Sequence, residues 1–111
     1  MCSPTRPVIE SHYEVPLAAL IDLIAAGTDE SLRQLYDRTV PVVYSVAARA
    51  VRDVDRAELI TQQVYLDVWR RAGAFDATAG SVESWLIQLT RARLIGDLRH
   101  RRAEPAKVSA A

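Results

Sequence analysis

Arginines gather toward the C-terminal end of this 111-residue chain, where residues 70–111 hold seven arginines and one lysine. Arginine forms paired hydrogen bonds with phosphate and stacks on flat rings, so this segment suits a nucleic-acid partner. An unpaired base also needs a stacking surface, which Phe75 and Trp85 can offer. The candidate nucleic-acid-binding residues are Phe75, Trp85, Arg91, Arg93, Arg99, Arg101 and Arg102.

The formal net charge of zero conceals an uneven distribution of charge along the chain. Residues 1–69 contain six basic and ten acidic side chains, a balance of −4, whereas residues 70–111 contain eight basic and four acidic ones, a balance of +4. This asymmetry predicts one face for a polyanion and another face for a different partner. An ordinary solvated surface whose charges happen to segregate explains the pattern equally well.

Residues for catalysis or metal binding are absent or scattered. Cys2, His12 and His100 lie far apart in the sequence and form no metal-binding motif. The four glycines are isolated, so no phosphate-cradling loop is predicted, and neither histidine has a nucleophile at a motif spacing. We therefore expect no catalytic residue, no metal and no cofactor, in a protein that is not an enzyme.

Three features bear on the cellular location. A single cysteine cannot form an internal disulfide, which fits a reducing cytoplasm. No apolar run approaches the length of a membrane span. Residues 1–16 carry charges and no apolar run, so they do not resemble a secretory signal. We expect a cytoplasmic protein with no membrane partner.

The hydrophobic pattern predicts an all-α fold, a three- to four-helix bundle, with apolar residues at helical spacing and no strand pattern. Pro41 falls inside the second predicted helix and should kink or split it near Thr39. The four helices are predicted over residues 16–26, 28–52, 56–72 and 81–102. The helical domain is expected to span 16–102, between a flexible arm at 1–15 and a linker or tail at 103–111.

The last predicted helix is apolar on two opposite sides, and its second side includes Ile95 and Leu98. Such a helix either lies between neighbours or offers one side to a partner. Trp69 and Trp85 both fall on apolar stripes, so we expect both in the core.

Two blocks of sequence carry a family resemblance. Residues 57–70 read AELITQQVYLDVWR, and residues 84–99 read SWLIQLTRARLIGDLR after a Phe-Asp pair at 75–76. In this order and spacing they resemble region 2 of bacterial sigma factors, and most closely the extracytoplasmic-function (ECF) group. The resemblance covers about residues 17–102, and Pro41 also suits the pattern of that family.

The resemblance implies a bundle that binds core RNA polymerase and opens promoter DNA. The helix matching residues 56–71 would dock on the coiled coil of the largest polymerase subunit. Residues 75–102 would take up the −10 element and hold the non-template strand. An anti-sigma factor would be a further partner. The implied polymerase-docking residues are Glu58, Leu59, Gln62, Gln63 and Asp67.

The chain departs from the family pattern at four positions. The docking helix commonly carries an acidic residue where this chain has Leu59, and Glu where it has Gln63. In the DNA-reading helix, a frequent Asn is replaced by Ala92 and a frequent Asp by Gly96. ECF factors also carry a second domain, region 4, for which nothing after Arg102 is long enough. Either the chain is a piece of a longer factor, or it is a protein that keeps only region 2.

These departures motivate a second hypothesis, a sigma-like interaction protein that binds a regulator or polymerase without reading a promoter. Individual residues also have structural alternatives. Arg93 could be paired within the fold, and Phe75 could close the loop over the core. The arginines at positions 99, 101 and 102 could simply complement the helix dipole. A general helical DNA-binding regulator is disfavoured because no recognition-helix turn is evident.

Overall fold

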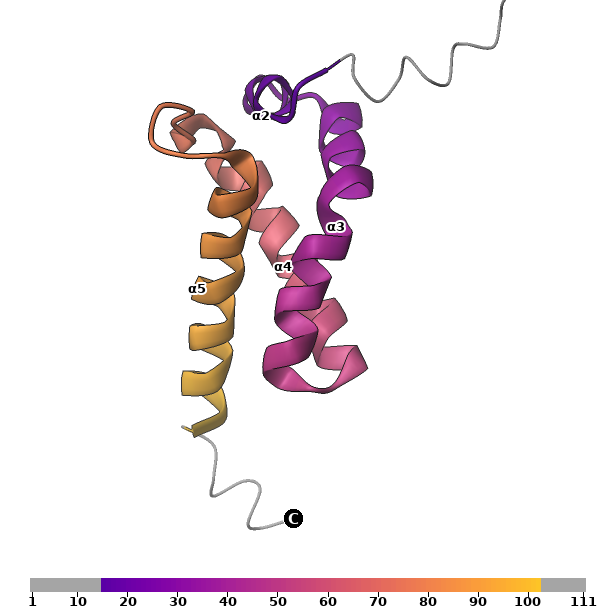
Figure 1. Cartoon of the computed structure of the whole chain (residues 1–111), viewed down its shortest axis with the longest axis vertical. Coiled ribbons are helices and arrows are strands. Elements are labelled where there is room, and N and C mark those ends of the chain that lie inside the picture. Colours follow the sequence, from indigo (N-terminus) through magenta and orange to yellow (C-terminus); the bar gives the residue numbers. More distant parts are fainter. Residues whose placement is uncertain (1–14, 103–111) are drawn as a thin grey trace, which may run out of the picture.

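The computed structural model of the chain describes residues 15–102 and has an all-α fold, as predicted, with no strand among these residues (Figure 1). The helices lie within about two residues of the predicted ranges. A short 3-10 helix, which was not predicted, follows the third of them. The elements are α2 (Leu17–Ala25), α3 (Asp29–Val51), α4 (Val54–Arg71), η1 (Ala72–Ala74) and α5 (Val82–Arg102).

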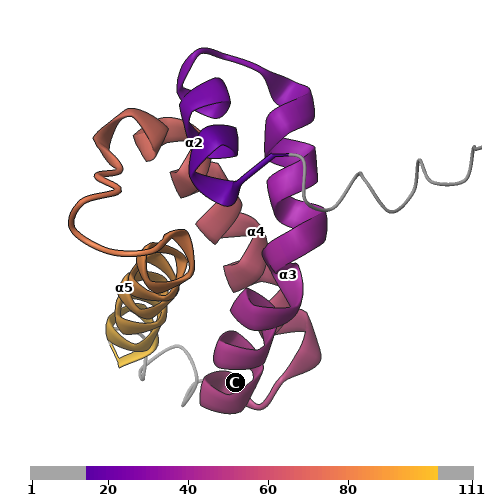
Figure 2. The ribbon, with the colours of Figure 1, turned by 45° about the horizontal axis from the view of Figure 1, so that its top comes forward.

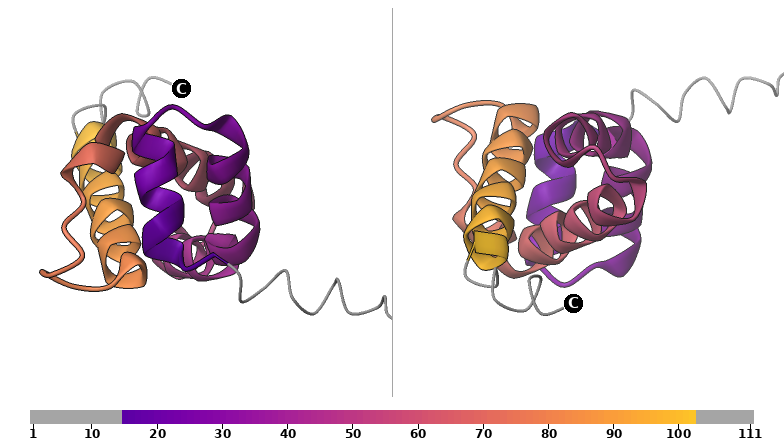
Figure 3. Two further views of the ribbon diagram at one scale, coloured as in Figure 1. Left: turned by 90° about the horizontal axis from the view of Figure 1, so that it is seen from above. Right: turned by 90° about the horizontal axis from the view of Figure 1, so that it is seen from below.

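The three long helices α3, α4 and α5 pack against one another, and the short α2 lies against α3 and α4 at one end of the bundle (Figures 1 and 2). The loop that leads into α5 lies at this same end, and the last residues of α5 lie at the opposite end. Seen along the bundle, α5 stands beside α2 and α4 on one side of the molecule (Figure 3). Helices α4 and α5 therefore form an antiparallel pair.

Every helix contributes aliphatic side chains to a single core. Three residues of α2 are buried together with Leu35 and Val43 of α3. Burial of such side chains stabilises a fold by about 1.5–3 kcal/mol each, which fixes the packing of these helices. The three α2 residues are Leu20, Ile21 and Ile24, and further large buried aliphatic residues are Ile60, Val64, Val68 and Leu86.

Each long helix also buries one threonine whose hydroxyl is satisfied within its own helix. Thr39 donates to the carbonyl of Leu35 at 2.6 Å. Thr61 and Thr90 donate to the carbonyls four residues earlier at 2.7 Å each. A buried hydroxyl without a partner would cost about 1–3 kcal/mol, and these bonds remove that cost.

Side chains at the helix starts cap two of the long helices. Ser81 precedes α5, and its hydroxyl accepts a hydrogen bond from the Ser84 amide at 3.0 Å. The capping residue of α4 is Asp53, whose side chain accepts a hydrogen bond from the Arg56 amide at 3.2 Å. Helix α3 runs unbroken through Pro41, so of the two predicted outcomes, a kink or a split, the split does not occur. The proline lies on an exposed face, where the carbonyl that loses its partner can bind water.

The predicted arm and tail lie outside the described residues, apart from Val15. Its carbonyl accepts a hydrogen bond from Arg38 Nη1 at 2.6 Å, which joins the segment before α2 to the middle of α3.

Candidate functional site

Helix α4 turns one side to solvent along its length. Of the predicted docking residues, Glu58, Leu59 and Gln62 are exposed on this side, and the Leu59 side chain is 54% exposed. Leu66 and Trp69 continue the same side with exposures of 53% and 39%. We call Leu59, Gln62, Leu66 and Trp69 the α4 ridge.

Sequence reasoning missed half of the α4 ridge. Trp69 was expected in the core and is substantially exposed, so that prediction is wrong. Leu66 was not considered, although a helical wheel places it within about 20° of Leu59 and about 120° from the buried Ile60. Leu59 and Leu66 lie seven positions apart on an otherwise polar side of the helix, and this spacing in the sequence was the signal for an exposed apolar ridge.

The docking residues divide between two grooves that flank α4. Glu58 and Gln62 line a groove of about 490 Å³ between α3 and α4, together with Tyr36, Pro41 and Tyr44. We call it the α3/α4 groove. The buried Tyr65 lies beside this groove, and its hydroxyl is 2.6 Å from the Thr39 hydroxyl. Its ring packs edge-on against the ring of Tyr36, with the two ring centroids 4.9 Å apart. Burial raises the pKa of Tyr65 to about 12.

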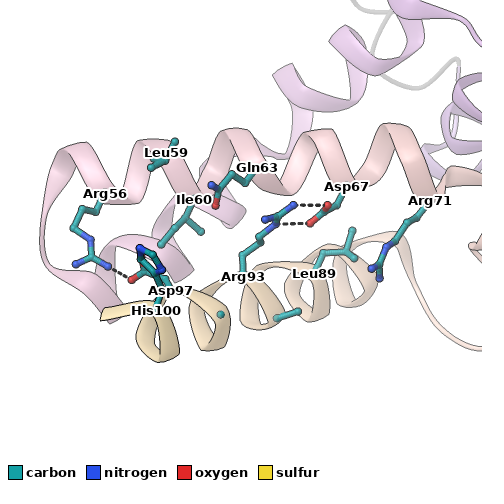
Figure 4. A pocket seen from close by; sticks show the side chains of 12 residues that line it. Arg56, Leu59, Ile60, Gln63, Asp67, Arg71, Leu89, Arg93, Asp97 and His100 are labelled. Atoms are coloured by element: carbon teal, nitrogen blue, oxygen red, sulfur yellow. Dashed lines mark hydrogen bonds and ion pairs between the residues drawn. The ribbon is translucent and has the colours of Figure 1, made fainter. Parts of the chain in front are cut away.

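The second groove, of about 680 Å³, lies between α4 and α5 (Figure 4). We call it the α4/α5 groove. The remaining docking residues, Leu59, Gln63 and Asp67, line it together with Ala92 and Gly96. All four positions at which the chain departs from the sigma pattern therefore lie on this one groove. The sequence alone could not show this, because the positions are up to 37 residues apart.

A bidentate ion pair closes part of the α4/α5 groove. Arg93 donates from Nε and from Nη2 to the two carboxylate oxygens of Asp67, each at 2.7 Å (Figure 4). The side chains are 32% and 13% exposed, respectively. Hydrogen bonding to Asp67 raises the pKa of Arg93. A predicted DNA-binding residue and a predicted polymerase-docking residue are thus bound to each other, in agreement with the internally paired alternative for Arg93.

A second ion pair crosses the groove near its other end, where Arg56 of α4 meets Asp97 of α5 (Figure 4). Both side chains are partly buried. Two arginine–aspartate pairs therefore join α4 to α5 along the groove. Charge-assisted hydrogen bonds are stronger than neutral ones, and a bidentate pair such as Arg93–Asp67 also fixes the relative orientation of its two side chains.

The arginines of α5 form a row instead of a cluster. With 100° of rotation per residue, Arg91, Arg99 and Arg102 fall within about 80° of one another, while Arg101 points elsewhere. All four side chains are exposed. Between them lie Ile95 and Leu98, which are about half exposed, so this part of the second apolar side of α5 is open to solvent within the described residues.

Phe75 and Trp85 meet at the start of α5, whereas Arg99 and Arg102 of the arginine row lie near its end. Their ring centroids are 5.1 Å apart with an interplanar angle of 55°, and both rings are half-buried against the core. The loop beside them is held by Thr78, which donates from its amide and hydroxyl to Asp76 Oδ1 at 2.9 and 2.6 Å. These bonds lower the pKa of Asp76. Phe75 therefore does cover the core, and both rings keep part of their surface exposed.

At 1.5 Å per residue, Trp85 and Arg102 are separated by about 25 Å along α5. A single ligand that touches both must therefore be extended and must follow the helix.

Two further findings concern the described part of the chain. Within residues 15–102 no three His, Cys, Asp or Glu side chains gather closely enough to hold a metal ion. In the same range, no helix combines the length and the apolar character that crossing a bilayer requires.

The sequence matches the family described as Sigma-70 region 2 over residues 35–104, which is more than half of the chain. The chain therefore belongs to the sigma-70 region 2 family. The match includes α4, α5 and most of α3, so both grooves and the arginine row lie within it.

Relatives with known names place the chain close to the ECF group. It is 39% identical over 87 residues to the ECF RNA polymerase sigma factor SigK of Mycobacterium ulcerans (strain Agy99), covering 78% of this chain and 46% of the relative. It is 35% identical over 109 residues to SigK of Mycobacterium sp. (strain KMS), covering 98% of this chain and 56% of the relative. The chain spans about half the length of these relatives.

Proposed function

We propose that this chain is a non-enzymatic, cytoplasmic sigma region 2 module that docks on core RNA polymerase and binds and opens the promoter −10 element during transcription initiation. One observation carries the proposal. The segment that matches the sigma family exposes Glu58, Leu59 and Gln62 of the predicted docking residues on α4, and it exposes four arginines on a different helix, α5. Two partners can therefore be held at once.

For the polymerase, we propose that the coiled coil of the largest subunit packs along the α4 ridge. Leu59 and Leu66 offer apolar area, which is the main source of affinity in a helix-to-helix contact. Glu58 and Gln62 add directional hydrogen bonds from the α3/α4 groove, where neither is engaged in a side-chain bond within the described residues.

For DNA, we propose that the non-template strand follows α5 from the Phe75–Trp85 pair to the arginine row. Arg91, Arg99 and Arg102 lie on one exposed side of the helix and can neutralise successive phosphates. The exposed parts of the two rings supply a stacking surface for an unpaired base. Arg101 reaches a neighbouring phosphate from the edge of the row, whereas Arg93 remains with Asp67.

The DNA proposal is tested by fluorescence anisotropy of a labelled single-stranded −10 oligonucleotide across a salt series. Replacing Arg91, Arg99 and Arg102 with alanine should reduce the salt slope by about 2, since each phosphate on a single strand contributes about 0.7. A triple alanine variant at Arg33, Arg49 and Arg52 of the α3 region removes the same charge and should leave most of the binding. Equal losses in the two variants, or no binding at low salt, would contradict the proposal.

The docking proposal is tested by retention of the chain on immobilised core polymerase. We expect Glu58→Ala combined with Gln62→Ala to weaken retention by about tenfold, as loss of central interface contacts does. Gln88→Ala, which removes a glutamine side chain from α5, is the matched control. Unchanged retention of the double variant would show that the docking face lies elsewhere.

A second candidate is a sigma-like interaction protein that binds a regulator or polymerase without reading a promoter. Two observations favour it. Arg93 is occupied by Asp67, and Ala92 presents no hydrogen-bonding side chain at a DNA-reading position. Polymerase retention without any preference among single-stranded sequences would support this candidate.

A further inference from the structure

Two exposed aliphatic side chains interrupt the arginine row of α5. Ile95 is 51% exposed and Leu98 is 48% exposed. Ile95 lies one helical turn after Arg91 and one turn before Arg99, since each arginine is four residues away. Leu98 lies one turn before Arg102. We call Ile95 and Leu98 the aliphatic strip.

The aliphatic strip faces the same way as the arginines that flank it. With 100° of rotation per residue, Ile95 points within about 40° of Arg91 and of Arg99. Leu98 points within about 40° of Arg102. At 1.5 Å per residue, Arg91 and Arg99 are separated by about 12 Å along the helix axis. A nucleic-acid strand whose phosphates are held at both of these arginines must lay the intervening sugars across the strip.

The other parts of the proposed DNA surface do not distinguish DNA from RNA. Arginine side chains contact phosphates, which the two polymers share. The Phe75–Trp85 pair offers a stacking surface, and every base has a face that can stack on it. The two polymers differ at the sugar, because ribose carries a 2′-hydroxyl. A side chain that contacts the sugar can therefore select between them.

The aliphatic strip provides no hydrogen-bond partner for a 2′-hydroxyl. One turn away from Ile95 along α5, Ala92 and Leu98 carry no polar group. The other two residues at this spacing are Arg91 and Arg99, which the phosphates would engage. A hydroxyl pressed against the strip would lose its hydrogen bonds with water and gain none in return. The C2′ methylene of deoxyribose would instead gain an apolar contact.

We propose that the aliphatic strip contacts deoxyribose and makes the chain select single-stranded DNA over single-stranded RNA. The inference rests on the proposed DNA-binding role of α5 and gives each kind of side chain its own task. The arginines supply affinity for a strand with either sugar, whereas Ile95 and Leu98 set the preference for deoxyribose. Because transcripts are made where the chain would act, this preference keeps the arginine row available for DNA.

The experiment measures the fluorescence anisotropy of labelled oligonucleotides mixed with the full chain at low salt. Strands of about 12 nucleotides, made of deoxyuridine or of uridine, differ only in the 2′-hydroxyl. We expect the deoxyuridine strand to bind about tenfold more tightly, because a hydroxyl without a partner carries a cost of about this size. A 2′-fluorouridine strand keeps a ribose-like ring shape but has no hydroxyl, and it should bind as the DNA strand does.

Ile95→Gln combined with Leu98→Gln makes the strip polar and leaves every arginine in place. This variant should bind the two strands to within about twofold of each other, and its salt slope should match that of the wild type because the phosphate contacts are unchanged. Leu23→Gln combined with Val42→Gln is the matched control at aliphatic positions that are 44% and 41% exposed on α2 and α3. It should keep the full preference for DNA. Circular dichroism would show that both variants retain their helices.

The outcomes separate this inference from the proposed function. Equal affinity of the wild type for the deoxyuridine and uridine strands would overturn the inference while the DNA-binding role stands. The same holds if the variant at Ile95 and Leu98 keeps the full preference. A 2′-fluorouridine strand that binds as RNA does would also overturn the inference, since the chain would then respond to the shape of the sugar ring. No binding of any strand at low salt would contradict both proposals, because the arginine row would then hold no phosphate.

Discussion

The two grooves beside α4 differ in what their polar side chains are already bound to. In the α3/α4 groove, Glu58 and Gln62 are exposed beside two tyrosines and engage in no side-chain bond within residues 15–102. In the α4/α5 groove, Asp67 and Asp97 are each paired with an arginine of the opposite helix. One groove has acceptors to offer, and the other has mainly donors and aliphatic surface.

The difference shows that residues adjacent on one helix can serve different purposes. Glu58 and Leu59 are neighbours in sequence, yet 100° of rotation places them toward different grooves. The set of docking residues that the family resemblance implies therefore mixes exposed groups with groups that hold the fold together. Asp67 is of the second kind.

The largest expected effect is on the free energy of unfolding, and it would sharpen the contrast between the two grooves. Asp67→Ala should lower the free energy of unfolding by about 2 kcal/mol, between the values for exposed and buried pairs, because Arg93 loses its partner in a partly buried place. Glu58→Ala should change it by less than about 0.5 kcal/mol, as surface substitutions do. Urea denaturation followed by circular dichroism measures both. Similar losses in the two variants would remove the distinction between the grooves.

A smaller effect concerns alkaline pH and the interior beside the α3/α4 groove. Burial raises the pKa of Tyr65 from 10.0 to about 12, so the folded state favours the protonated phenol. This difference in pKa contributes in full to the free energy of unfolding below pH 10, and the contribution is lost as the pH rises through 10 toward 12. Below pH 10, Tyr65→Phe should cost about 1 kcal/mol for the hydrogen bond with Thr39.

The test is the difference in unfolding free energy between wild type and Tyr65→Phe, measured at intervals from about pH 8 to about pH 12. We expect the variant to lose less stability than the wild type over the upper half of this range, so that the difference shrinks. A difference that stays constant with pH would show that this phenol does not titrate as proposed.

The smallest effect concerns the open wall of the α4/α5 groove. Gly96→Ala should raise the free energy of unfolding by up to about 1 kcal/mol, because glycine is costly inside a helix and the added Cβ meets nothing within 4 Å. Gly27→Ala is the matched control and should destabilise, because Gly27 has a φ of +95°. Thermal unfolding compares them. Destabilisation by Gly96→Ala would mean that the groove wall is not open.

Much of the fold could be predicted from the sequence, because its signals are local. Apolar spacing located all four helices, and Ser81 marked the start of α5. The errors arose where tertiary packing decides the outcome. Trp69 lies on an apolar stripe but at the edge of the core, and Pro41 is tolerated in α3 because its side is exposed.

The candidate site was less predictable, since its main feature joins residues 26 positions apart. Nothing local relates Asp67 to Arg93, and only the packing of α4 on α5 brings them to 2.7 Å. The convergence of Leu59, Gln63, Ala92 and Gly96 on one groove has the same cause. Single positions were identified from the sequence, but their grouping depends on the helix pair.

The central claim is that α4 faces polymerase while α5 faces DNA, and site-specific photo-crosslinking tests it most directly. A photoreactive amino acid would replace Gln62 in one variant and Arg102 in another, each mixed with core polymerase and a labelled single-stranded oligonucleotide. The account predicts that position 62 crosslinks to the largest polymerase subunit and position 102 crosslinks to the oligonucleotide. Crosslinking of position 62 to DNA, of position 102 to polymerase alone, or of neither position to its partner would contradict it.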